Sequence, residues 1–102
     1  MYRLEFLPDA LQDMAEIIRY ISHDLDNKTA ALSLSENLLS SAENLKDFPY
    51  AHPVYQPIRP LEKEYRKCVV KNYLMFYTVD EANKTVTVFR VIYGKRDTEK
   101  ML

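Results

Sequence analysis

Residues 64–93 read EYRKCVVKNYLMFYTVDEANKTVTVFRVIY, and this stretch decides the fold. Three runs within it are rich in β-branched and aromatic residues, which favour strands: 64–70, 73–79 and 84–93. The short polar segments between the runs are typical of tight turns, and we expect Asn72 to take the positive φ angle in the first of them. Two successive hairpins predict an antiparallel meander.

The N-terminal half adds one short strand and two helices. Residues 2–7 alternate as a strand does, and apolar residues then recur at spacings of three and four over 9–23, which predicts an amphipathic helix. Asn27 is suited to cap a second helix that ends near Phe48, because Pro49 disfavours helical geometry before it. A loop with four prolines follows over 49–62.

The expected order is therefore β-α-α-β-β-β within one domain spanning 1–102. It predicts an α+β fold in which a helical hairpin packs on one face of a small, mainly antiparallel twisted sheet. The first strand can join this sheet at its edge or at its centre. Strict alternation along the last strand places Val86, Val88, Arg90 and Ile92 on one face, with Phe89 and Val91 on the other.

Composition excludes several classes of site. The single glycine, Gly94, excludes a glycine-rich phosphate loop, and the single cysteine, Cys68, excludes an internal disulfide and a multi-cysteine zinc site. His23 and His52 lack metal-ligand spacing. No apolar run approaches the roughly 18 residues that a membrane span needs, and the N-terminus does not resemble a signal peptide. We expect a cytoplasmic protein with no metal, cofactor or membrane partner.

Charge divides unevenly along the chain. Residues 1–57 carry a net charge of −5 and residues 58–102 a net charge of +4. Basic and aromatic residues gather in the second half. We expect five of the basic residues to converge on one surface or groove away from the acidic helix faces: Arg59, Arg66, Arg90, Lys95 and Arg96. This combination suits single-stranded RNA and also an acidic protein partner, while solvated surface charge is the simplest alternative. The candidate residues are Arg59, Tyr65, Arg66, Lys67, Arg90, Lys95 and Arg96.

Two residues offer weaker chemistry. His52 can be considered as a catalytic base, but a plain loop residue is the better interpretation. Cys68 follows Lys67, and neighbouring cations lower a thiol pKa. A lone cysteine in a strand is more often a small core residue, which is the interpretation that we favour.

The sequence resembles the RelE/ParE superfamily, the toxins of bacterial type II toxin–antitoxin, or plasmid stabilisation, systems. The resemblance covers essentially the whole chain, in the element order and in five ordered runs: 2–6, 8–10, 65–68, 76–80 and 90–97. It implies a sheet with a helical hairpin and a cognate antitoxin that wraps the toxin surface.

The resemblance implies two modes of action. RelE-like members cut mRNA in the ribosome without a metal, using strand cations and a late tyrosine. One of their arginines would fall at Leu74 and is absent, another falls at Arg96, and the tyrosine would fall near Leu102 and is also absent. ParE-like members instead bind and inhibit DNA gyrase, and the run 65–68 looks like theirs.

We therefore expect a gyrase-binding growth inhibitor that needs no catalytic set. The alternatives are a ribosome-dependent endoribonuclease and a degenerate toxin that only binds antitoxin. A nuclease would rely on cations and on a substituted proton donor, Tyr93 or Glu99; its cations would be Arg66, Arg90, Lys95 and Arg96. The oligomeric state, as a dimer or a toxin–antitoxin hetero-oligomer, stays open.

Overall fold

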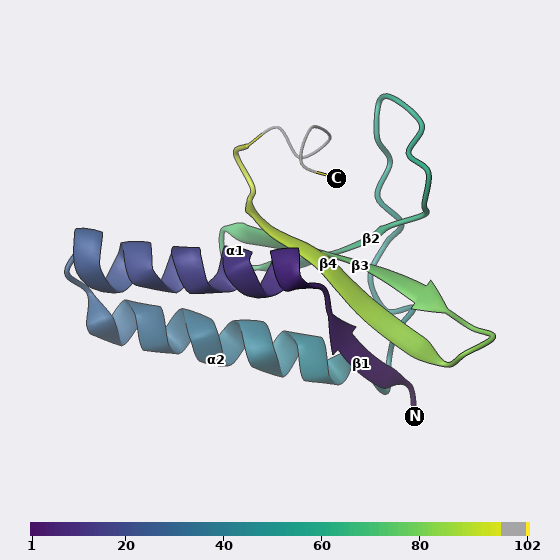
Figure 1. The fold of residues 1–102 in the computed structure, drawn as a ribbon, viewed down its shortest axis with the longest axis horizontal. Coiled ribbons are helices and arrows are strands. Elements are labelled where there is room, and N and C mark those ends of the chain that lie inside the picture. The colour runs from purple at the N-terminus through teal and green to yellow at the C-terminus, as the bar shows by residue number, and fades with distance from the viewer. Residues whose placement is uncertain (97–101) are drawn as a thin grey trace.

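The structure is a computed structural model that describes residues 1–96 and 102, with two helices and one π-helical turn on a four-stranded sheet (Figure 1). The elements follow the predicted order of strand, helix, helix and three strands. Their bounds are β1 Arg3–Phe6, α1 Pro8–Arg19, η1 Tyr20–Asp24, α2 Lys28–Asn44, β2 Arg66–Val70, β3 Tyr73–Asp80 and β4 Thr85–Tyr93. The predicted α+β architecture is confirmed.

The sheet has the strand order β1-β4-β3-β2. The last three strands form the predicted antiparallel meander, and β1 joins at the edge, parallel to β4, with Arg3 opposite Thr85 and Phe6 opposite Val88. Because β1 is short, β4 continues beyond it from Phe89 to Tyr93. This free length of β4 lies beside α1, which begins directly after β1.

Local sequence signals at the helix ends explain why the helical hairpin forms. Pro8 occupies the first turn of α1, where no amide partner is needed, and the Asn27 side chain accepts a hydrogen bond of 3.0 Å from the Ala30 amide, which confirms the predicted cap. The predicted helix 9–23 ends differently, because residues 20–24 widen into the π-helical turn η1. Because a π-helical turn contains more residues than an α-helical turn, Tyr20 and its neighbours point in other directions than they would in a regular α-helix.

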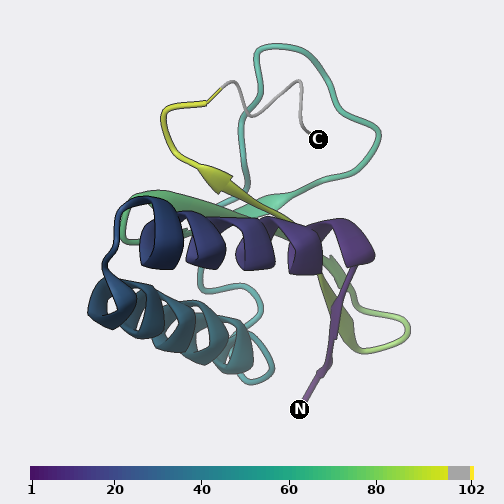
Figure 2. The same ribbon diagram turned by 60° about the vertical axis from the view of Figure 1, so that its left-hand side comes forward.

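Apolar residues form two clusters, one on each face of the sheet. The larger lies between the sheet and the helices and contains Leu38, Met75 and Tyr77. The smaller lies on the opposite face, where Tyr65, directly before β2, packs with Phe76 and Ile92, and Tyr55 and Leu61 of the proline-rich loop pack against them. Figure 2 shows that the segment between α2 and β2 starts beside the end of α2 and that its later part rises away from the two helices. The loop is thus a structural cover as well as a connection.

Two local expectations are corrected. A β-bulge lies where β4 faces Phe76 and Tyr77 of β3, and it interrupts the alternation of side chains between the two faces of the sheet. Val91 therefore joins Val88 in the helix-side cluster, while Ile92 packs on the other face. In the β2–β3 turn Lys71 takes the positive φ, 56°, in place of Asn72. The Asn72 carbonyl accepts the Gly94 amide at 2.9 Å, and a Cβ on Gly94 would lie 3.2 Å from this oxygen.

Candidate functional site

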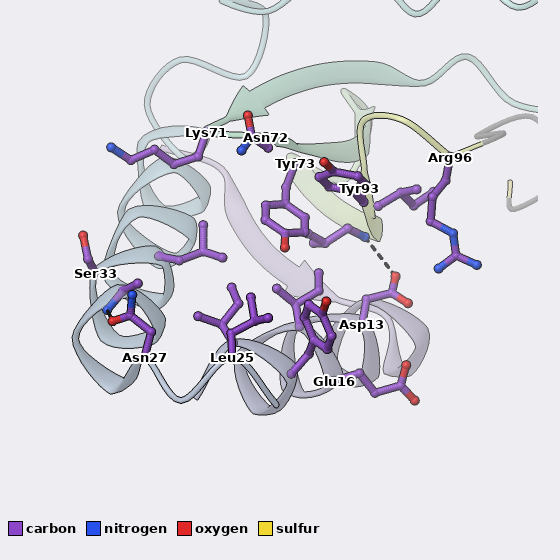
Figure 3. Close-up of a pocket in the computed structure, with 17 residues that line it drawn as sticks. Asp13, Glu16, Leu25, Asn27, Ser33, Lys71, Asn72, Tyr73, Tyr93 and Arg96 are labelled. Carbon is purple, nitrogen blue, oxygen red and sulfur yellow. Dashed lines mark hydrogen bonds between the residues drawn. The ribbon is translucent and has the colours of Figure 1, made fainter. Parts of the chain in front are cut away.

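A groove of about 860 Å³ lies between the helical hairpin and the end of the sheet that carries the β2–β3 turn (Figure 3). One wall comes from α1, η1 and the start of α2, and the other from the β2–β3 turn and the end of β4. Both walls carry charged and aromatic side chains among aliphatic ones: Asp13, Glu16 and Tyr20 from the helices, and Lys71, Tyr73, Tyr93 and Arg96 from the sheet.

The groove is fixed at one end by Asp13. Its carboxylate accepts hydrogen bonds from Arg90 Nε at 2.7 Å and Nη2 at 2.9 Å, and from the Val91 amide at 2.9 Å. Both charged side chains are largely buried, and the hydrogen bond to Asp13 raises the pKa of Arg90. Asp13 therefore accepts a hydrogen bond from a β4 amide at the sheet edge, beyond the point where β1 has ended, and it ties α1 to the sheet.

This ion pair corrects the expectation that the acidic helix faces lie away from the basic residues. Asp13 and Glu16 line the same groove as Arg96, and Asp13 binds Arg90 directly. Arg90 is therefore paired with a carboxylate within the fold. Its first role is structural.

Tyrosines line the middle of the sheet wall. The rings of Tyr73 and Tyr93 lie 5.6 Å apart between centroids, tilted by 58°. Burial raises the pKa of Tyr73, and the neighbouring hydroxyls of Tyr93 and Tyr20 raise it further. Tyr20 and Leu25 on the helix wall are 51% and 55% exposed. The groove thus presents apolar and hydroxyl surface that a partner can cover.

Arg66 lies outside this groove and anchors the start of the proline-rich loop. Its Nη1 donates to the His52 carbonyl at 2.8 Å, and its guanidinium lies 4.8 Å from the centre of the Tyr50 ring. Next to it, the buried Tyr77 hydroxyl donates to the Pro49 carbonyl at 2.7 Å, and burial raises the pKa of Tyr77 to about 12. His52 contributes its carbonyl here, and its ring stands edge-on to Tyr77 at 6.2 Å.

The remaining predicted residues spread over other surfaces. Tyr65 is buried edge-on against Phe89 at 5.3 Å, and burial raises its pKa. The Lys67 ammonium lies 5.8 Å from the Tyr55 ring centroid, whereas Arg59 and Lys95 are exposed. Of the predicted set only Tyr93 and Arg96 line the groove, so the predicted residues are not brought together in it. Glu99 falls outside the described residues, as does most of the tail.

Cys68 is buried between the sheet and the helices, and burial raises the pKa of its thiol. This supports the interpretation of Cys68 as a core residue. Within residues 1–96 and 102, no cluster of three or more histidine, cysteine or acidic residues is arranged to hold a metal ion. The helices in the same residues are too short or too polar to cross a membrane.

Sequence reasoning missed the helix wall of the groove. Asp13, Glu16 and Tyr20 are spaced at i, i+3 and i+7, which aligns them along one flank of α1. A polar stripe that ends in an exposed tyrosine beside the apolar stripe was the available signal.

A second, smaller groove of about 450 Å³ lies between the two helices on their outer side. It is mainly apolar, with Met14 and Ile18 from α1 facing Leu38 and Leu39 from α2, and with Arg19 and His23 at one end. These two grooves of the helical side differ in their chemistry.

The sequence matches the family model described as the ParE toxin of the type II toxin–antitoxin system parDE over residues 4–98. No curated protein matches it. The fold is similar to a chain of the chromosomal ParDE system from P. aeruginosa, with a TM-score of 0.72 at 15% identity, covering 91% of this chain and 96% of that one. It is also similar to a chain of the RelBE2 toxin–antitoxin complex from Mycobacterium tuberculosis, with a TM-score of 0.62 at 17% identity, covering 90% and 96%. The isolated E. coli RelE toxin gives a TM-score of 0.56 at 18% identity, covering the whole of both chains.

Proposed function

The chain belongs to the ParE toxin family of type II toxin–antitoxin systems, and we propose that it inhibits growth by binding DNA gyrase and is neutralised by a cognate antitoxin. The family match over residues 4–98 is the observation that carries this proposal. We propose that residues 1–102 act as one cytoplasmic toxin domain without a cofactor or metal.

The residues at two strand positions, Leu74 and Arg90, support the gyrase mode. The RelE-like arginine position is occupied by Leu74, which packs against the smaller core cluster. Arg90 is held by Asp13, so its charge is already matched by a carboxylate. Cleavage of RNA needs cations for the developing phosphate charge and groups that move protons, whereas inhibition by binding needs neither.

A ribosome-dependent endoribonuclease is the second candidate, favoured by the fold similarity to RelE and RelBE chains and by the presence of Tyr93 and Arg96 in one groove. Arg66 and Lys95 would then supply further positive charge. A degenerate toxin that keeps only antitoxin binding is the third candidate.

The deciding experiment adds purified protein to DNA gyrase and relaxed plasmid and follows supercoiling, while primer extension follows mRNA from induced cells. We expect loss of supercoiling, relief by the antitoxin and intact mRNA. Codon-specific cuts that disappear in Arg66→Ala and Arg96→Ala would establish the nuclease mode instead. Growth arrest without either effect would exclude both targets, and absence of arrest with antitoxin binding retained would indicate the degenerate toxin.

A further inference from the structure

The groove beside α1 has a charge pattern that sets what it can bind. Figure 3 shows Lys71 and Arg96 at the two ends of the sheet wall, with Tyr73 and Tyr93 between them. The turn that carries Lys71 is held beside the end of β4, because the Asn72 carbonyl accepts the Gly94 amide at 2.9 Å. The two cations are therefore presented on one connected piece of structure.

The helix wall does not cancel both of these charges. Asp13 is already matched by Arg90 at 2.7 and 2.9 Å, so its carboxylate is committed to the sheet. Glu16 is the other acidic residue of the wall and lies at the Arg96 end, whereas Asn27 and Ser33 line the Lys71 end. An occupant consequently meets a positive sheet wall with neutral polar groups opposite Lys71.

The centre of the groove favours apolar side chains. Ile17, Ile21 and Leu25 face the two tyrosine rings across it, and Leu25 is more than half exposed. Apolar surface of this kind stabilises a complex when a partner covers it, and charged groups at the rim select which partner binds.

We propose that Lys71 and Arg96 are specificity-determining residues that select an antitoxin segment with two acidic side chains flanking an apolar stretch. The proposal rests on the proposed function, since it takes the antitoxin as the occupant. The apolar stretch covers Tyr73, Tyr93 and Leu25, and the two carboxylates pair with Lys71 and Arg96.

The test measures the dissociation constant by calorimetry between this protein and the product of the reading frame beside its gene. Lys71→Glu and Arg96→Glu should each weaken binding about tenfold, and the double variant more than either. Lys63→Glu is the matched control, because Lys63 lies over the Phe89 ring in the proline-rich loop, outside the groove, and should bind within about twofold of the parent. Changing the matching acidic residue of the partner to lysine should restore binding to Arg96→Glu. Hydrogen exchange at 71–73 and 91–93 should slow on binding.

Unchanged affinity in the double variant, or protection confined to the outer helical groove, would overturn this inference and leave the proposed function standing. Growth arrest by the wild-type protein that the partner still relieves would show that the function holds in that case. No binding by the wild-type protein, or self-association through 91–93 in place of partner binding, would overturn the inference. If growth arrest and its relief were also missing, the proposed function would fail with it.

Discussion

The carboxylate of Asp13 bridges the Arg90 guanidinium and the Val91 amide, so one side chain of α1 completes the hydrogen bonding of β4 where β1 stops. The bridge holds the helix wall and the sheet wall of the groove in one geometry. Few other contacts in the described structure connect charge, sheet edge and site so directly.

Loss of this bridge should destabilise the fold. Asp13→Ala removes the acceptor that Arg90 Nε, Arg90 Nη2 and the Val91 amide share in a largely buried place, and we expect the free energy of unfolding to fall by about 2–3 kcal/mol. Urea unfolding of Asp13→Ala, Arg90→Ala and the double variant should give a coupling energy of about 1–3 kcal/mol. Glu36→Ala, on the exposed face of α2, is the control and should change stability by less than about 0.5 kcal/mol. Additive effects of the two substitutions would show that the bridge contributes nothing.

Tyr77 should make stability depend on alkaline pH. Its folded pKa of about 12 lies above the ordinary value of 10, so the unfolded chain ionises first. The contribution of Tyr77 to the free energy of unfolding is complete below pH 10 and is lost as the pH rises toward 12. Urea unfolding between pH 9 and 11.5 should therefore show a steeper loss for the wild type than for Tyr77→Phe. At pH 7 the variant should lose about 1–2 kcal/mol, because the Pro49 carbonyl loses its buried donor. Identical pH profiles would contradict this account.

The cap of α2 can be tested alone. Asn27→Ala removes the acceptor of the Ala30 amide and should cost about 1 kcal/mol. Ser40→Ala, on the exposed face of the same helix, should be neutral or slightly stabilising, because alanine has the higher helix propensity. Thermal unfolding followed by circular dichroism measures both, and equal melting temperatures for the two variants would refute the cap.

Cys68 should resist modification in the native protein. Its thiol is buried and its pKa is raised, so little reactive thiolate forms near neutral pH. Labelling with a thiol-specific disulfide reagent at pH 7.5 should be at least about a hundredfold slower in buffer than in 6 M guanidinium. Native labelling at the rate of a free thiol would instead mark Cys68 as an accessible, reactive group.

Local patterns were enough to predict the helices, the meander and the Asn27 cap, because each depends on neighbours in sequence. The position of β1 at the sheet edge, the β-bulge in β4 and the cover formed by Tyr65 depend on contacts between distant segments. The candidate site divides in the same way. Tyr93 follows from its place at the end of the last strand and Arg96 from its place just after it, whereas the contribution of Asp13 required knowing which face of α1 meets the edge of β4.

The parallel pairing of Arg3–Phe6 with Thr85–Val88 has a consequence for synthesis of the protein. During translation β1 leaves the ribosome long before its partner exists, and a contact of such high sequence separation forms late. The helical hairpin can form early, but its apolar face has no complete sheet to cover until β4 follows. A growing chain therefore cannot form the bridge between Asp13 and Arg90, or close the groove beside α1, until β4 has left the ribosome.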